Sequence, residues 1–172
     1  MNFLRTLAVT LVLLASPLSH ASFLLEPYLG YHFGTMDWGS SDDTAKGPTF
    51  GGRVGFSQLG LQFGADYMGG NWEIDRSPSF KGSASNLGIF VGYDFPVLFR
   101  AYATYFFDAE LKDTSKYEGN LIRFGVGLSP VPLIDINLEY MTATYDKNNG
   151  NSLGTNAKLN MFGVTVSIPF TL

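Results

Sequence analysis

The sequence contains no cysteine among its 172 residues. Anchoring through an acylated cysteine is therefore excluded, and so is any disulfide framework. A basic excess is also missing, because 11 Lys and Arg residues stand against 15 Asp and Glu residues. This balance argues against nucleic acid as a partner. Outside the first residues there is no apolar run near the ~20 residues that a spanning helix needs.

The N-terminus has the order of a secretory signal. Residues 1–5 carry one positive charge, residues 7–15 are apolar and uncharged, and Ser19-His20-Ala21 offers small residues at a cleavage site. The apolar run is too short to span a membrane as a helix. We therefore expect a cleaved signal peptide over residues 1–21 and one exported domain over residues 22–172.

The rest of the chain alternates between apolar and polar residues with the period of a β-strand. Eight segments show this pattern: residues 25–34, 50–56, 59–67, 86–93, 97–107, 121–128, 134–142 and 161–170. One face of these segments carries no charge. The other face carries seven charges: Glu26, Arg53, Asp66, Arg100, Arg123, Asp135 and Glu139. The pattern predicts an all-β protein, an eight-stranded antiparallel up-and-down transmembrane β-barrel.

The connections between these segments alternate in length. Residues 57–58, 94–96 and 129–132 form short connections, whereas long polar ones cover residues 35–48, 69–85, 108–120 and 143–160. Outer-membrane barrels have short periplasmic turns and long extracellular loops. We therefore expect a bacterial outer-membrane location, with both termini periplasmic because the strand number is even.

A soluble barrel of the lipocalin type would also alternate, with its apolar face turned inward. Its outer face should then be rich in lysine, glutamate and threonine. Here the polar face is rich in glycine instead, which weakens strands. Glycine is useful inside a small barrel, where it leaves room for side chains such as Arg100, Arg123 and Tyr102. The composition thus favours lipid outside and charges inside.

Aromatic residues of the apolar face gather towards the segment ends. Such positions suit the two girdles that lie at the level of the lipid headgroups. The candidate interfacial residues are Tyr31, Phe33, Phe50, Phe56, Tyr67, Tyr93, Phe99, Tyr105, Phe107 and Phe170.

Together these features resemble the small outer-membrane barrels of the OmpA and OmpX type, over essentially all of residues 22–172. The end of the chain is similar to the C-terminal signal that the barrel-insertion machinery reads in that class. The alternating residues are Val164, Val166, Ile168, Phe170 and Leu172, with leucine in place of the usual terminal aromatic. The resemblance implies outer-membrane lipid, lipopolysaccharide and the insertion machinery as partners, and no cofactor.

The charges of the lumen need partners, because an isolated buried charge is very costly. With the third turn centred near Val131, Arg123 and Glu139 are expected opposite each other on neighbouring strands, in a network also reached by Arg53 or Arg100. Eight strands enclose an interior just wide enough for side chains to fill. A lumen plugged by polar side chains is therefore the favoured interpretation, and a narrow pore for small solutes or ions is the alternative.

Two small outer-membrane barrels modify lipid A, so an enzyme is a further alternative. The palmitoyltransferase type needs an N-terminal amphipathic helix, for which the short distance between the leader and the first strand leaves no room. The deacylase type needs His, Ser and Glu on its outer surface. The only histidine after the leader, His32, is expected to face the lumen without a serine neighbour and to contact Asp66. We predict no catalytic residue.

The loops are the remaining place for function. Trp38 and Trp72 are expected to be exposed there, as anchors for a partner or as interfacial residues. The acids at positions 37, 42 and 43 lack the ordered spacing of a calcium loop, so no metal site is expected. The main hypothesis is a structural, surface-interaction or adhesion role through four extracellular loops that contact an extracellular ligand or a host surface.

Overall fold

The computed structural model describes residues 21–39, 41–75, 80–131 and 133–172. Apart from Ala21, the expected signal peptide lies outside the described residues, and its cleavage stays a prediction. The strands are β1 (Ser22–Asp37), β2 (Asp42–Gln58), β3 (Leu61–Asp75), β4 (Phe80–Asp94), β5 (Phe99–Lys112), β6 (Lys116–Val131), β7 (Ile134–Asn148), β8 (Asn151–Ser167) and β9 (Phe170–Thr171).

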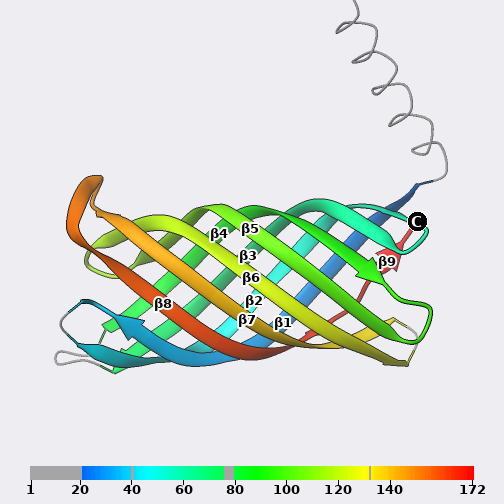
Figure 1. Ribbon diagram of the computed structural model, residues 1–172, viewed down its shortest axis with the longest axis horizontal. Helices are drawn as coiled ribbons and strands as arrows, with labels where there is room; N and C mark the ends of the chain where they lie inside the picture. Colours follow the sequence, from blue (N-terminus) through cyan, green and yellow to red (C-terminus); the bar gives the residue numbers. More distant parts are fainter. Residues whose placement is uncertain (1–20, 40, 76–79, 132) are drawn as a thin grey trace, which may run out of the picture.

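These strands form one closed antiparallel sheet (Figure 1). Each strand pairs with its neighbour in sequence, and β1 pairs with β2 on one side and with β8 and β9 on the other. The short β9 continues the line of β8 after Pro169, a residue that has no N–H to donate to a sheet. The predicted eight-stranded up-and-down barrel is confirmed, since β8 and β9 occupy one position in the sheet.

Side chains alternate between the inside and the outside of this barrel. On β6, for example, Ile122 and Phe124 are exposed, whereas Arg123 between them is fully buried. β-Branched and aromatic residues favour a pleated strand, and the period of two sends alternate residues to opposite faces. The apolar residues of the eight segments therefore cover the outside of the barrel, and the charges lie within.

The four long connections are strands over most of their length, so the prediction of long loops there is wrong. The hairpins remain paired up to Asp37 with Asp42, Ile74 with Phe80, Lys112 with Lys116, and Asn148 with Asn151. These last strand pairs gather at one end of the barrel, on the left in Figure 1. We call this the hairpin end; its strands extend the barrel beyond the apolar belt.

The opposite end holds the three short connections between β2 and β3, β4 and β5, and β6 and β7. Phe23 and Leu172 exchange two backbone hydrogen bonds of 2.9 Å there, so the first and last strands meet at this end. We call it the turn end. Within the described residues, no helix combines the length and the hydropathy that crossing a membrane requires.

Candidate functional site: the filled barrel interior

The interior of the barrel contains a charged layer that lies nearer the turn end. It consists of the seven charged residues named above, contributed by β1, β2, β3, β5, β6 and β7, and each is buried. Four are carboxylates and three are guanidinium groups. Since inward positions alternate along each strand, residues far apart in the sequence meet across a lumen only a few side chains wide.

Arg100 organises the part of this layer closest to the turns. Its two terminal nitrogens donate to the Glu26 carboxylate at 2.6 and 3.0 Å, and one of them also contacts Asp135. Gln62 accepts a further hydrogen bond of 3.1 Å from Arg100. The planar guanidinium thus uses its forked geometry to hold one carboxylate from β1 and one from β7.

Arg53 connects this group to a second one. It donates to Glu26 at 2.9 Å and to Asp66 at 3.2 Å, and lies 3.5 Å from Glu139. Asp66 also receives hydrogen bonds from Tyr28 at 2.8 Å and from Thr104 at 3.0 Å. A single Asp66 carboxylate therefore has several donors, which is the arrangement that makes a buried charge tolerable.

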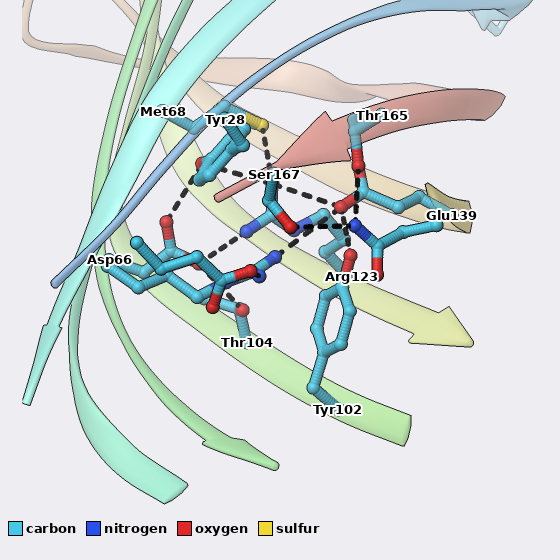
Figure 2. Close-up of polar contacts among 12 residues, drawn as sticks. Tyr28, Asp66, Met68, Tyr102, Thr104, Arg123, Glu139, Thr165 and Ser167 are labelled. Carbon is cyan, nitrogen blue, oxygen red and sulfur yellow. Dashed lines mark hydrogen bonds and ion pairs between the residues drawn. The ribbon is translucent and has the colours of Figure 1, made fainter. Parts of the chain in front are cut away.

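Arg123 completes the second group (Figure 2). It contacts Asp66, donates to the Tyr28 hydroxyl at 3.1 Å, and lies 3.7 Å from Glu139. The Tyr102 hydroxyl also donates to Glu139. The carboxylates, guanidinium groups and phenols thus form one continuous network through the lumen.

Aromatic rings separate the three guanidinium groups from one another. The Arg53 guanidinium lies 3.9 Å from the centre of the Tyr102 ring and 5.0 Å from that of Tyr28. Arg123 lies 5.2 Å from the centre of the Phe106 ring. Cations are attracted to ring faces, most strongly where water is excluded. These rings therefore stabilise the cations while they fill the space between them.

His32 is buried at the hairpin side of this network. Its Nε2 atom lies 2.9 Å from Glu139, and its Nδ1 atom lies 3.0 Å from the Thr49 hydroxyl. The expected contact with Asp66 is wrong, because His32 contacts Glu139 instead, and both residues pair with Gly163 of the intervening β8. A hydroxyl, an imidazole and a carboxylate in this order resemble a hydrolase triad. All three groups are sealed from solvent, however, which leaves no room for a substrate.

The expected cross-strand pair of Arg123 and Glu139 is wrong in register. Arg123 lies opposite Met141 on β7, and Glu139 lies opposite Gly125. The first pair after the turn is Val131 with Ile134, so the turn is centred beyond Val131, and even after the one-residue shift between Val131 and Leu128 the partners differ by two residues from those that a turn centred at Val131 implies. The two charges still come within reach diagonally, and Arg53 and Arg100 both join the network.

Lumen glycines make room for the large side chains. A Cβ atom built on Gly163 would lie 2.1 Å from the His32 ring, and one on Gly125 would lie 2.1 Å from the Tyr102 ring. Real Cβ atoms do not approach other atoms so closely. The glycine bias of the polar face therefore has a steric cause at these two positions.

A second interior layer, which sequence reasoning missed, fills the hairpin end with apolar side chains. Its largest members are Met36, Met68, Trp72, Ile74, Leu111, Leu121, Met141, Tyr145, Leu159 and Met161, none more than 1% exposed. Several of them belong to segments that were expected to be loops. Their alternation with polar neighbours was the available signal: Trp72 and Ile74 lie two residues apart, as do Leu159 and Met161.

The two tryptophans, which were expected to be exposed, are less exposed than predicted. Trp72 is inside the barrel rather than exposed, and its Nε1 atom donates to the Thr49 hydroxyl at 3.4 Å. Trp38 is partly buried, and its ring lies 5.3 Å from that of Tyr117 in an edge-on contact. Neither side chain is therefore a free anchor at the surface.

The outside of the barrel carries a continuous apolar belt. The ten candidate interfacial aromatics all point outward and are exposed, and so are the five residues proposed as the insertion signal. Towards the hairpin end the belt is followed by polar residues and by all six lysines of the sequence, namely Lys46, Lys81, Lys112, Lys116, Lys147 and Lys158. The surface thus separates into an apolar belt and a charged end.

Charged groups of the hairpin end are paired with one another in places. Lys46 contacts Asp75 at 3.3 Å, and Lys81 contacts Glu73 at 3.1 Å. Lys116 reaches both Glu110 and Glu118, and its hydrogen bond lowers the pKa of the Glu118 carboxyl. In the described part of the chain, no group of three or more His, Asp and Glu residues is placed to hold a metal ion.

Comparisons with known proteins agree on the architecture. The sequence matches no family model and no curated protein sequence. Among solved structures, the chain is similar to Neisserial surface protein A (NspA), with a TM-score of 0.59, 14% identity, and coverage of 86% of this chain and 97% of that one. It is also similar to the N-terminal β-barrel domain of Pseudomonas aeruginosa OprF, with a TM-score of 0.50, 13% identity, and coverage of 86% and 97%. At such identities the likeness concerns the fold, and the chain has the fold of the small eight-stranded outer-membrane barrels that its sequence pattern resembles.

Proposed function

We propose that the protein is an integral barrel of the bacterial outer membrane with a closed lumen, which presents its hairpin end to the outside of the cell. The apolar belt supports the membrane location, because large exposed apolar surfaces on a monomer mark contact with lipid or protein. Closure of the sheet supports it as well, since no strand edge is left unpaired in hydrocarbon. With the hairpins outside, both termini lie in the periplasm.

The observation that carries the closed lumen is the pair of stacked interior layers. An ion entering from the hairpin end meets buried methionines, leucines and Trp72, which offer no group to replace its hydration shell. Beyond them it meets carboxylates and guanidinium groups that already bind one another. Both layers therefore oppose conduction. The apolar layer excludes water, and the charges of the other layer are already paired with one another.

Planar-bilayer recording of the refolded protein tests this closure. We expect no steady current at any salt concentration, apart from brief events at high voltage. Steady open currents that saturate with salt would overturn the closed lumen and favour the narrow pore. The alternative of a lipid A-modifying enzyme has little support, since the sealed His32 cannot reach a lipid. Release or transfer of acyl chains from purified lipid A by the protein would contradict this view.

A surface-interaction or adhesion role is the function that we infer for the hairpin end. Its paired strands extend beyond the belt, and its lysines and acids form a mixed charged surface of the kind that suits polar partners. The partners that we propose are lipopolysaccharide around the barrel and a polar extracellular ligand or host surface above it. The outward residues of the last strands are proposed to contact the barrel-insertion machinery during assembly.

Shortened hairpins test this role. The β7–β8 hairpin can be closed with an Asn-Gly turn between Tyr145 and Ala157, which are paired residues. We expect the full-length protein in vesicles to bind at least one of immobilised fibronectin, laminin and collagen, and the shortened variant to lose this binding while its heat-modifiable gel migration persists. Absence of binding by the full-length protein to all three would contradict an adhesion role of this kind.

A further inference from the structure

The turn end of the barrel is unusually apolar for a surface that faces water. The side chains that project there include Leu59, Phe95, Val97, Leu98, Val131 and Leu133, all exposed, with Leu59 at 92%. The described turn residues 57–60, 94–98, 129–131 and 133 contain a single charge, Asp94, which receives a hydrogen bond from Gln62. Every lysine of the sequence lies at the other end.

Three of these residues also adopt a backbone conformation that leucine disfavours. Leu59, Leu98 and Leu133 have φ values of 51°, 63° and 68°, one in each turn. Glycine and asparagine accept this left-handed region far more readily than a residue with a bulky side chain. At the hairpin end the chain follows that preference, with Gly39, Asn149 and Gly150 at positive φ. At the hairpin end this conformation is thus filled by polar or small residues, whereas each turn at the turn end has a leucine in it, with Gly60 beside Leu59.

The height of the apolar belt gives an independent reason for these leucines. On β2 and β4 the belt runs from Phe50 to Phe56 and from Leu87 to Tyr93, six residue steps each, whereas on β1 it runs from Phe23 to Phe33, ten steps. With a rise of about 3.3 Å per residue and a tilt of about 40°, six steps cover only about 15 Å. The apolar band of such barrels is about 25 Å tall. Towards the hairpin end the next outward residues are Pro48 and Lys46 on β2 and Ser85 on β4, so on these two strands the apolar surface continues further at the turns than towards the hairpins.

We propose that the turn end lies within the lipid, with Leu59, Leu98 and Leu133 inserted among the acyl chains of the inner leaflet. This inference rests on the proposed membrane location and adds that the three turns anchor the barrel in depth. Transfer of the leucine side chains from water to hydrocarbon has a favourable free energy, which offsets the cost of their backbone conformation. A turn bathed in water would carry the same backbone cost without that gain.

Spin labels test the depth of the turns directly. Because the chain has no cysteine, Leu59→Cys, Leu98→Cys and Leu133→Cys each provide a unique attachment site. In vesicles of dilauroylphosphatidylcholine, we expect nitroxides at all three positions to be accessible to oxygen and shielded from water-soluble nickel ethylenediaminediacetate. Leu138→Cys, on the outer face of β7, is the lipid reference, and Ser152→Cys, exposed at the hairpin end, is the water reference.

The outcomes separate this inference from the membrane location itself. If the label at position 138 is in lipid but the labels in the turns are in water, the inference of inserted turns is wrong and the membrane location stands. If Leu138 also reports water, the membrane location fails. Turn labels shielded from both reagents would mean that a second copy of the chain or another protein covers the turn end, which also overturns the inference.

The unfolding of Leu98→Asn is a second test, because the substitution should change the stability of the barrel in opposite directions for a turn in water and a turn in lipid. Asparagine relieves the backbone cost, so in water the substitution should stabilise the barrel. In lipid the lost transfer of the leucine side chain outweighs this relief, and we expect the folded-to-unfolded ratio to fall roughly three- to tenfold. Asn149→Leu at the hairpin tip is the matched control and should lower stability through backbone strain alone. A stabilised Leu98→Asn variant would overturn the inference.

Discussion

Two buried tyrosines of the interior differ in whether their hydroxyl groups have a partner. The Tyr102 hydroxyl donates to Glu139, whereas the buried Tyr145 hydroxyl has no hydrogen-bond partner among the described residues. A buried polar group without a partner keeps the full cost of its desolvation. The two residues therefore allow the same substitution to be compared with and without a hydrogen bond.

We expect Tyr145→Phe to leave the barrel as stable as before or to stabilise it by about 1 kcal/mol, because no hydrogen bond is lost. Tyr102→Phe should destabilise it by about 1–3 kcal/mol, because Glu139 loses a donor. Urea unfolding of the barrel in vesicles of dilauroylphosphatidylcholine measures both. Equal losses in the two variants would show that Tyr145 has an ordered water as its partner.

At the scale of the strand, alternation along the sequence identified which residues enter the lumen but not where the strands end. The period of two assigned Arg53 and Glu139 to the inside without reference to their partners. Beyond the belt, outward residues become polar, and the pattern of an apolar outer face stops although the inward alternation at Trp72 and Ile74 continues. Strand ends that are placed from the apolar outer face alone therefore make the strands too short.

Register was harder to predict than strand identity for a related physical reason. Irregular pairing near Leu128 and between Glu118 and Gly119 changes which residues face each other, and a β-bulge has no strong sequence signal. Contacts across the lumen, such as that of Arg100 with Glu26, depend on the accumulated stagger of all the strands between them. They could not follow from the pairing of two neighbours.

The β5–β6 hairpin contains an ion-pair cluster whose pH dependence can be predicted. The Lys116 ammonium lowers the pKa of Glu118 below its usual 4.5, and the two carboxylates raise the pKa of Lys116. A carboxyl with a lowered pKa contributes stability that is present above its unfolded value and lost as the pH falls through its folded value. We therefore expect the tip of this hairpin to loosen below about pH 4.5.

Hydrogen exchange of the backbone amides from Glu110 to Glu118, corrected for intrinsic rates, measures this loosening. Protection should fall between pH 6 and pH 3 in the wild type and should change little in Lys116→Gln, which lacks the cation. High salt should weaken the effect, since the groups are near the surface. Protection that is independent of pH in the wild type would contradict the role of the cluster.

At the scale of the whole molecule, the barrel has two apolar surfaces, one on its outside and one inside its hairpin end. The outer belt meets lipid, which is fluid and can fill the space left by a smaller side chain. The inner layer of the hairpin end meets only protein, which is packed like a crystal and relaxes incompletely. The charged layer lies between that inner layer and the turn end, so the interior of the barrel consists of an apolar core next to a charged one.

This difference predicts unequal effects of one substitution at two places. Leu121 is fully buried in the inner layer, whereas Leu138 is 62% exposed on the belt. Leu→Ala removes the same atoms at both positions, and the lost transfer costs about 2 kcal/mol in each case. Only Leu121→Ala also leaves a cavity, so we expect it to cost about 1–2 kcal/mol more than Leu138→Ala. Urea midpoints in vesicles of dilauroylphosphatidylcholine measure the difference. Equal losses would mean that water or a mobile neighbour fills the space beside Leu121, and the inner layer would then no longer qualify as the seal of the lumen.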